Sequence, residues 1–275
     1  MKKLGLLIII LMLSATAWGY FKAKPNTAIE KLTLTGSSTV APLAAEIAKR
    51  FESLYPNVRV DVQTGGSSRG INDTRSGLAN IGMASRALKK NESELFSYTI
   101  ALDGISIIIH QANPVISLDK QQIIDIYTGK IVNWQDVGGN DAPITVVNKA
   151  AGRSTLELFL HYFGLKNTQV KPHVVIGDNQ QGIKTVSGNP NAIGYVSVGS
   201  AEYEATHNVP IKLLPLEGIT ASVENVRQRN FPLSRPLNLI TREAATGIAK
   251  TFIEFARSTQ VNDLIEAQYF VPVEN

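Results

Sequence analysis

The chain has no cysteine among its 275 residues. This absence excludes disulfide bonds, thiolate zinc sites, iron–sulfur clusters, cysteine nucleophiles and a lipid anchor on an N-terminal cysteine. Charged residues are also few, at 18%, and 27 basic residues against 23 acidic ones give a net charge of only +4. So small a bias provides no argument for a nucleic-acid partner.

Internal repeats and low-complexity segments are absent from the sequence as well. The hydrophobic fraction of 44% is ordinary for a globular protein, and the low charged fraction argues against disorder. A chain of this length can bury a sizeable core without covalent cross-links. The composition therefore predicts one large or two medium folded domains.

One long apolar run stands at the N-terminus. Lys2 and Lys3 precede an almost unbroken apolar stretch over 4–13, and Ala-Thr-Ala at 15–17 fits a cleavage site. The run is shorter than the roughly 20 residues of a membrane-spanning helix. Residues 1–19 are therefore predicted to be a cleaved secretory signal, whose removal would lower the net charge from +4 to +2. The alternative is an uncleaved N-terminal anchor with aromatic residues at the membrane interface.

Strand and helix patterns alternate in the first third of the remaining chain. Lys31–Thr35 alternates with a period of two and predicts a strand. Apolar residues in 41–54 recur at a spacing near 3.6, which predicts a helix. The next predicted elements are a strand at 58–62, a helix at 69–78 and a strand at 79–84. This order implies a mostly parallel sheet covered by helices.

A second alternation follows a buried-type strand at 105–109. Its predicted helices are 118–127, 154–163, 182–186, 243–255 and 261–267, and its predicted strands are 144–147, 174–176, 192–198 and 237–240. Two such α/β units indicate two lobes with a cleft between them. We expect the first part of lobe 1 at 20–105, lobe 2 at 106–201, and a crossover with the C-terminal part of lobe 1 at 202–275.

Three loops rich in glycine and hydroxyl residues each follow a predicted strand and precede a predicted helix. They are Gly36–Val40, Gly65–Gly70 and Gly152–Thr155. Ligands bind at the carboxyl ends of strands in open α/β sheets. A helix start offers unpaired N–H groups and partial positive charge, and hydroxyls add donors that reorient freely. Each loop alone could be ordinary helix capping, but together they favour a site for a tetrahedral oxyanion.

Basic residues flank these loops, namely Arg69, Arg86, Lys149 and Arg153. Arginine can bind an oxyanion with two parallel hydrogen bonds, whereas lysine acts as a point charge. None of the loops matches a P-loop, and the G-x-S-x-G nucleophile elbow is absent. No histidine pair or D-x-D-x-D-G loop has the spacing of a metal site. The sequence therefore favours binding over catalysis.

Six segments carry recognisable patterns, namely Thr35–Leu43, Gly65–Ile71, Asn80–Leu88, Ile126–Trp134, Ala192–Ser197 and Phe231–Leu237. Together they resemble the periplasmic phosphate-binding proteins of high-affinity ABC uptake systems. The resemblance runs from about Leu32 to Phe255. It implies an α/β, two-lobed type II periplasmic-binding-protein fold, in which each lobe is a mostly parallel sheet flanked by helices and the ligand cleft lies between the lobes.

The resemblance also implies a phosphate site built from hydroxyls and backbone N–H groups of both lobes. The expected phosphate-binding residues are Ser37, Ser38, Thr39, Val40 (through its backbone), Ser67, Ser68, Ser85, Arg86, Lys149, Arg153, Ser154 and Thr155. No catalytic residue, metal or cofactor is expected. The expected partners are inorganic phosphate and the membrane permease of an ABC importer. We expect a monomer in the periplasm, with no nucleic-acid partner.

Two departures from the family pattern bear on the ligand. Lys149 stands where an arginine is common, and Arg153-Ser154-Thr155 replaces Ser-Gly-Thr. In well-studied members an aspartate after Ala-Ser accepts the proton of hydrogen phosphate, whereas here Arg86 follows Ser85. Losing that acceptor removes the repulsion that rejects fully ionised oxyanions. Sulfate, molybdate and tungstate therefore stay alternative ligands, and an adhesion or sensing protein with the same fold is the alternative outside transport.

Overall fold

The structure is a computed structural model that describes residues 28–273 of the chain. From Lys31 onward the chain forms one compact unit. The predicted signal segment, 1–19, lies outside the described residues. Within the described part, no helix combines the length and the apolar character needed to cross a bilayer.

The first lobe alternates strands and helices in the order that the sequence pattern predicts. Its elements are β1 (Glu30–Gly36), α2 (Ala41–Leu54), β2 (Val58–Thr64), α3 (Ser67–Ser76), β3 (Ile81–Ala84) and η1 (Lys90–Glu92), joined later by α9 (Gly247–Ala256), η4 (Thr259–Val261) and α10 (Asn262–Ala267). Helix α2 buries a face made of Leu43, Ile47 and Phe51, as its periodicity predicts. Phe252 of α9 and Ile265 of α10 enter the same core. The C-terminal helices therefore pack on the first lobe.

The second lobe contains the other helices of the described chain. Its elements are α4 (Lys120–Tyr127), η2 (Trp134–Val137), β5 (Thr145–Lys149), α5 (Ser154–Phe163), η3 (Asn167–Gln169), β6 (Val174–Ile176), α6 (Asn179–Ser187), β7 (Ala192–Ser197), α7 (Val198–Thr206), β8 (Ile211–Leu214) and α8 (Val223–Arg227). In its core the rings of Phe159 and Tyr195 stack with centroids 4.0 Å apart. Leu214 and Phe231 join this core, although 202–275 were expected to belong to a crossover and the first lobe. A boundary near residue 233 fits this packing better than one at 201.

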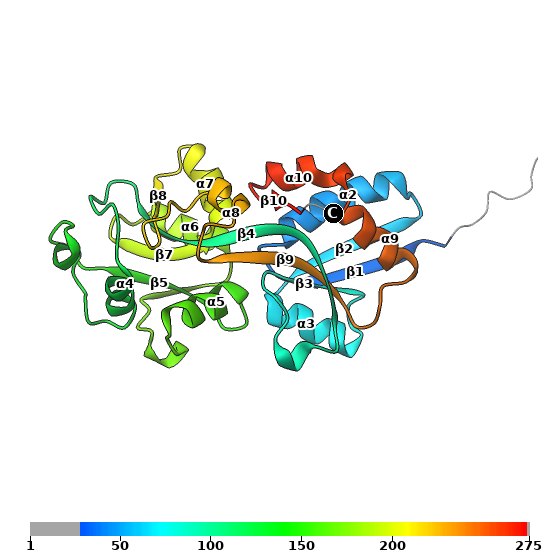
Figure 1. Cartoon of the computed structure of the whole chain (residues 1–275), viewed down its shortest axis with the longest axis horizontal. Coiled ribbons are helices and arrows are strands. Elements are labelled where there is room, and N and C mark those ends of the chain that lie inside the picture. Colours follow the sequence, from blue (N-terminus) through cyan, green and yellow to red (C-terminus); the bar gives the residue numbers. More distant parts are fainter. Residues whose placement is uncertain (1–27, 274–275) are drawn as a thin grey trace, which may run out of the picture. The chain divides into compact units, whose positions relative to one another are not determined.

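Two strands pass between the lobes, β4 (Phe96–His110) and β9 (Ser234–Thr241), and they pair antiparallel (Figure 1). They lie in the middle of a sheet with the order β2-β1-β3-β9-β4-β7-β5-β6, while β8 and β10 (Val271–Pro272) also pair with β4. Parallel pairing, as predicted, joins β1 to β3 and β5 to both β6 and β7. The sheet is nevertheless mixed, because one strand must run from the first lobe to the second and another must return.

The three hydroxyl-rich loops meet where the lobes adjoin. Gly65 donates a backbone hydrogen bond of 2.9 Å to the Gly36 carbonyl, which joins the first two loops. The Ser68 N–H donates to the Gly152 carbonyl at 3.2 Å, which joins the second loop to the third across the lobes. The starts of α2, α3 and α5 are therefore brought together by the fold, as the sequence pattern predicts.

Candidate functional site

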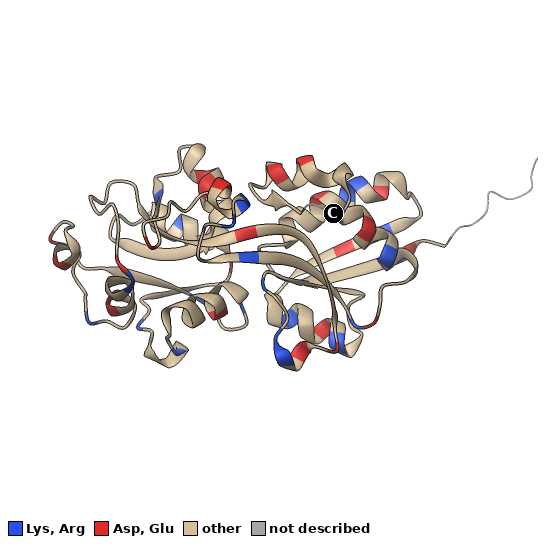
Figure 2. Cartoon of the chain, in the orientation of Figure 1, with Lys and Arg blue, Asp and Glu red and all other residues tan. Residues whose placement is uncertain are grey.

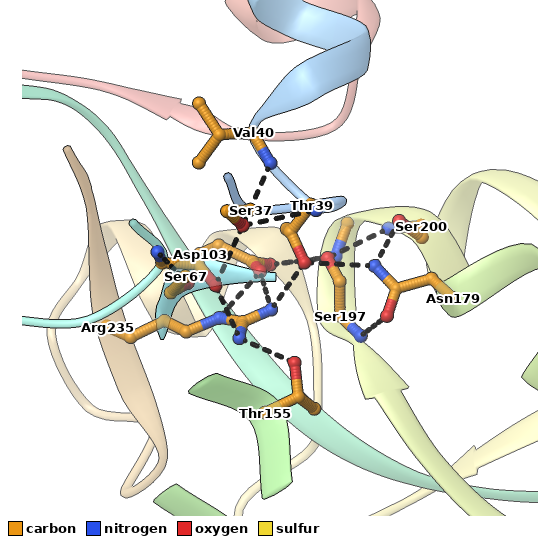
Figure 3. Close-up of polar contacts among 12 residues, drawn as sticks. Ser37, Thr39, Val40, Ser67, Asp103, Thr155, Asn179, Ser197, Ser200 and Arg235 are labelled. Carbon is orange, nitrogen blue, oxygen red and sulfur yellow. Dashed lines mark hydrogen bonds and ion pairs between the residues drawn. The ribbon is translucent and has the colours of Figure 1, made fainter. Parts of the chain in front are cut away.

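The loop between β1 and α2 is fixed by Ser37. Its Oγ accepts hydrogen bonds from the backbone N–H groups of Thr39 and Val40 at 3.2 and 3.3 Å, which fixes the turn that leads into α2 (Figure 3). The same hydroxyl donates to Ser85 Oγ at 3.1 Å. Glycine is required at position 36, where φ is +133° and an added Cβ would lie 2.3 Å from the Met83 carbonyl oxygen. The loop is thus held tightly against the end of β3.

The two serines that follow β2, at the start of α3, have different partners. Ser67 is buried, and its Oγ accepts the Ser85 backbone N–H at 3.2 Å. Ser68 instead donates to Glu157 Oε1 on α5 at 3.1 Å. Gly66 has φ of +96°, and an added Cβ would lie 2.7 Å from the Gly152 carbonyl oxygen. The second loop therefore touches the third through backbone that leaves no space for a side chain.

The loop before α5 supplies two buried hydroxyls. Thr155 Oγ1 accepts a hydrogen bond from Arg235 Nη1 at 2.9 Å. Ser154 is buried, and its Oγ has no hydrogen-bond partner among the described residues. A buried hydroxyl without a partner loses its hydration without compensation, so a ligand oxygen beside it would restore that bond. Arg153 is half-buried and lies at the N-terminal end of α5.

Arg235, on β9, links these loops (Figure 3). Its guanidinium is buried and donates from Nη1 to Ser85 Oγ at 3.3 Å as well as to Thr155, and from Nη2 to Thr39 Oγ1 at 3.4 Å. A full positive charge therefore lies among hydroxyls from all sides of the junction. Sequence reasoning missed Arg235 as a site residue, although it stands inside the Phe231–Leu237 segment that carries the family resemblance.

Asp103 on β4 fixes the guanidinium in this position. The strand register places Asp103 opposite Arg235, and Figure 2 shows an acidic and a basic position side by side where β4 and β9 cross between the lobes. Asp103 Oδ2 accepts from Arg235 Nε and Nη2 at 3.0 and 2.8 Å. Its Oδ1 accepts from Ser197 Oγ at 2.9 Å and from the Gly199 N–H at 3.2 Å. Both oxygens are occupied, so Asp103 orients Arg235. Sequence reasoning did not assign it to the site.

Lys149 and Asn179 complete the network from the second lobe. Lys149 Nζ donates to Asn179 Oδ1 at 3.0 Å, and Asn179 Nδ2 donates to Thr39 Oγ1 at 3.3 Å, across the lobes. Burial lowers the pKa of Lys149 to about 7, helped by the nearby charge of Arg235. An anion beside this lysine would favour its charged form. Asn179, at the start of α6, is a further residue that the sequence did not reveal.

Arg86 is buried next to the network but points its side chain elsewhere. Its Nη1 and Nη2 donate to the two carboxylate oxygens of Glu92 at 2.7 and 2.8 Å, and its Nε lies 3.0 Å from Glu157 Oε2. Only its backbone carbonyl faces β9, where it accepts from Asn238 Nδ2 at 2.8 Å. The structure therefore joins the expected residues Ser37, Thr39, Ser67, Ser85 and Thr155 in one hydrogen-bonded network. Ser154 Oγ has no partner among the described residues, Ser68 bonds to Glu157, and the Arg86 guanidinium is separate from the network.

A pocket of about 840 Å³ opens beside the network, between α2 and α10 of the first lobe and α6 and α7 of the second. Thr39 and Asn179 belong to both the pocket wall and the buried network, and Ser38 and Arg153 also line the pocket. The hydroxyl and amide groups can donate or accept hydrogen bonds, Arg153 adds a positive charge, and Asp178 also lines the pocket. Among residues 28–273, no three His, Asp or Glu side chains lie close enough together to hold a metal ion. The arrangement is suited to binding a small anion that offers many acceptor directions.

Comparisons with known proteins show which family the chain belongs to. The PBP superfamily domain matches residues 22–260. The phosphate-binding protein PstS of Bacillus subtilis is 26% identical over 247 residues, which cover 88% of this chain and 80% of that protein. A structure described as a phosphate ABC transporter substrate-binding protein from Clostridium perfringens, with bound phosphate, is 34% identical with a TM-score of 0.82, covering 89% of this chain and all (100%) of that one.

An ABC-type phosphate transport receptor from Vibrio cholerae is similar too, at 32% identity and a TM-score of 0.72, again covering 89% of this chain and 100% of that one. The two-lobed α/β fold and the resemblance drawn from the six sequence segments are thereby confirmed. The chain belongs to the PBP superfamily, in the family that includes these phosphate-binding transport proteins.

Proposed function

We propose that this protein is a receptor that binds inorganic phosphate between its lobes and delivers it to an ABC importer. The observation that carries the proposal is the buried network in which Arg235 is surrounded by Thr39, Ser85 and Thr155. Thr39 and Ser85 belong to the first lobe, in the loop before α2 and just after β3, and Thr155 belongs to the second lobe, so a phosphate among them would hold the lobes together. Its similarity to phosphate transport receptors supports the same ligand and the same kind of system.

The site can bind an anion although its own net charge is small. The charge of Arg235 is offset by Asp103, and most other donors are neutral hydroxyls and backbone N–H groups. Preorganised dipoles of this kind stabilise an anion without the repulsion that a cluster of cations would create in the free protein. Lobe closure would then follow from a higher affinity of the ligand for the closed arrangement.

The location and partners are part of the same proposal. The N-terminal basic, apolar and small-residue segments support export by a cleavable signal peptide into the periplasm. There the protein would act as a monomer, without a cofactor and without catalysis, and would dock on a membrane permease. The absence of cysteine from the chain is compatible with this compartment, because the core is large enough to need no disulfides.

Isothermal titration with phosphate, sulfate and molybdate tests the proposal. We expect saturable binding of phosphate at one site per chain, with weaker binding of the other anions. No heat at millimolar phosphate would overturn the assignment, whereas tighter binding of sulfate or molybdate would make the protein a receptor for that oxyanion. Turnover of a chromogenic phosphate ester would contradict the binding-only role.

A further inference from the structure

Glu157 lies on the second lobe, and both of its carboxylate oxygens contact residues of the first lobe. Its Oε1 accepts a hydrogen bond from Ser68 Oγ at 3.1 Å. Its Oε2 lies 3.0 Å from Arg86 Nε and 2.7 Å from Lys89 Nζ. All these partners belong to the first lobe, whereas Glu157 stands on α5, whose neighbouring residue Leu156 packs into the second-lobe core.

The first-lobe side of this contact is rigid. Arg86 is buried and is held by Glu92 through two hydrogen bonds, and its Nη1 also donates to the Ala87 carbonyl at 2.8 Å. Burial by itself would lower the pKa of Arg86, but Glu92 and Glu157 outweigh burial and raise it above its ordinary value. The guanidinium is therefore a fixed cation, and its Nε lies 3.0 Å from Glu157 Oε2 as an ion pair without a hydrogen bond. Lys89 adds a half-exposed cation to the same carboxylate oxygen.

The backbone contact beside this cluster exists only while the lobes are together. The Ser68 N–H bonds to the Gly152 carbonyl at 3.2 Å, and Gly66 fits against Gly152 only because it has no side chain. Figure 1 shows α3 and α5 on the same side of the two crossing strands. The pocket that adjoins Thr39 lies instead between α2, α10, α6 and α7. The contact of α3 with α5 is therefore separate from the pocket.

We propose that Glu157, Arg86, Lys89 and Ser68 form a latch, here named the α3–α5 latch, that holds the lobes closed around the ligand. The inference rests on the proposed function and goes beyond it. It assigns Arg86 and Ser68, two expected ligand residues, to closure. Opening the lobes would pull Glu157 away from three partners, leaving Arg86 with its first-lobe partners Glu92 and the Ala87 carbonyl. The latch contributes free energy to the closed state only, so it slows release of the ligand and makes little difference to its entry.

The variant Glu157→Gln tests the latch, because it keeps the size of the side chain and removes its charge. We expect the phosphate dissociation rate and the Kd to rise together by about tenfold, with little change in the association rate. The matched control is Glu94→Gln. Glu94 pairs with Arg75 at 2.7 Å within the first lobe, so the control loses one ion pair without affecting closure.

Whether Glu157→Gln weakens or tightens phosphate binding distinguishes a carboxylate that holds the lobes closed from one that only lies near the bound anion. A carboxylate that only lies near a bound anion repels it, so its removal would tighten binding. Unchanged or tighter phosphate binding by Glu157→Gln would therefore overturn the latch. Equal weakening by Glu94→Gln would overturn it too, since a general loss of ion pairing would then explain both.

A second measurement needs no ligand and keeps the latch testable if phosphate proves to be the wrong anion. The chain has no cysteine, so single cysteines at Leu54 and Val132, exposed residues of the first and second lobes, can carry a pair of spin labels. We expect Glu157→Gln to shift the interlobe distances of the free protein toward longer values. An unchanged distribution would overturn the latch, while failure of the parent protein to bind phosphate would overturn only the proposed function.

Discussion

Two buried arginines stand at the junction of the lobes, and they differ in what receives their hydrogen bonds. Arg235 gives Nε and Nη2 to Asp103 and directs Nη1 at the hydroxyls of Thr155 and Ser85. Arg86 donates from both Nη atoms to Glu92, and its Nε forms an ion pair at 3.0 Å, without a hydrogen bond, with a second carboxylate, Glu157. Both side chains are almost fully buried, so burial alone does not distinguish them.

The difference shows which kind of buried arginine serves an anion. Hydroxyl acceptors can rotate and become donors, so a ligand oxygen can enter beside Arg235 without leaving an unsatisfied group. Carboxylates cannot donate when ionised, and the two around Arg86, against the single Asp103 beside Arg235, would repel the same ligand. The first arginine is therefore suited to ligand binding, and the second to holding protein segments together.

The same substitution at both arginines gives the largest contrast. Arg235→Lys keeps the charge but cannot bond Asp103 and the loop hydroxyls together, because lysine lacks the planar fork. We expect phosphate affinity to fall by about 100-fold. Arg86→Lys is the matched control, and it should lose only about tenfold, through a faster dissociation rate. Titration calorimetry and stopped-flow release measure both.

The comparison between the two arginines would fail if the order of these losses were reversed. A larger loss for Arg86→Lys than for Arg235→Lys would place the anion beside Arg86, as the sequence pattern first indicated. Circular dichroism melting curves of both variants show whether either loss of binding comes from unfolding, since Arg235→Lys weakens the ion pair with Asp103 and Arg86→Lys weakens those with Glu92 and Glu157. The two should melt at similar temperatures without ligand.

Most of the fold could be predicted because its signals are local. The helix predicted at 41–54 is α2, and the helix and strand predicted at 154–163 and 174–176 are α5 and β6 with the same bounds. The elements that were missed are short or lie where two lobes meet. Helix α8 has five residues, too few for a periodic pattern. Strand β4 begins at Phe96, but only its apolar run at 105–109 was predicted, because polar residues interrupt the part before it.

The site could be predicted only as far as its helix starts. Thr39, Ser67 and Thr155 are visible in the sequence because a hydroxyl beside glycine at a strand end is a local pattern. Arg235 and Asp103 are 132 positions apart, and only the antiparallel register of β4 and β9 makes them neighbours. Arg86 shows the opposite case. It is the residue after Ser85, which belongs to the site, but its side chain is bonded to Glu92, and no residue pattern specifies that direction.

Two buried threonines sharpen the contrast between ligand-facing and structural groups. Thr39 Oγ1 accepts from both Arg235 and Asn179, whereas Thr35 Oγ1 on β1 is buried without a partner in the described part of the chain. Thr39→Val should weaken phosphate binding by about 30-fold, because a charge-assisted hydrogen bond is lost. Thr35→Val should leave the Kd unchanged. Equal Kd values for the two variants would remove Thr39 from the site.

Two lysines extend the comparison to pH. Lys149 has a pKa of about 7 in the free protein, because burial and Arg235 disfavour its charge. A bound dianion favours the charged form, so binding above that pH must take up a proton. We therefore expect affinity to decline as pH rises from 7 to 8, by up to about tenfold.

The comparison variant Lys149→Arg stays charged over this pH range. The titration of phosphate itself affects both proteins equally, so it drops out of the ratio of their Kd values. Calorimetry in buffers of different ionisation enthalpy counts the protons taken up. Lys89→Arg, in the α3–α5 latch, should leave the pH profile as it is. A ratio that does not change with pH would show that ligand binding does not change the protonation of Lys149.

Two serines give the smallest effect and the finest distinction. Ser154 Oγ is buried without a partner in the described chain, whereas Ser68 Oγ donates to Glu157 in the α3–α5 latch. Ser154→Ala should weaken phosphate binding by about fivefold, yet leave the free protein at least as stable, because it removes an unsatisfied hydroxyl. Ser68→Ala should instead raise the dissociation rate and widen the interlobe distances of the free protein. If Ser154→Ala also destabilised the free protein, its hydroxyl would be bonded within the fold, and the ligand would have one donor fewer.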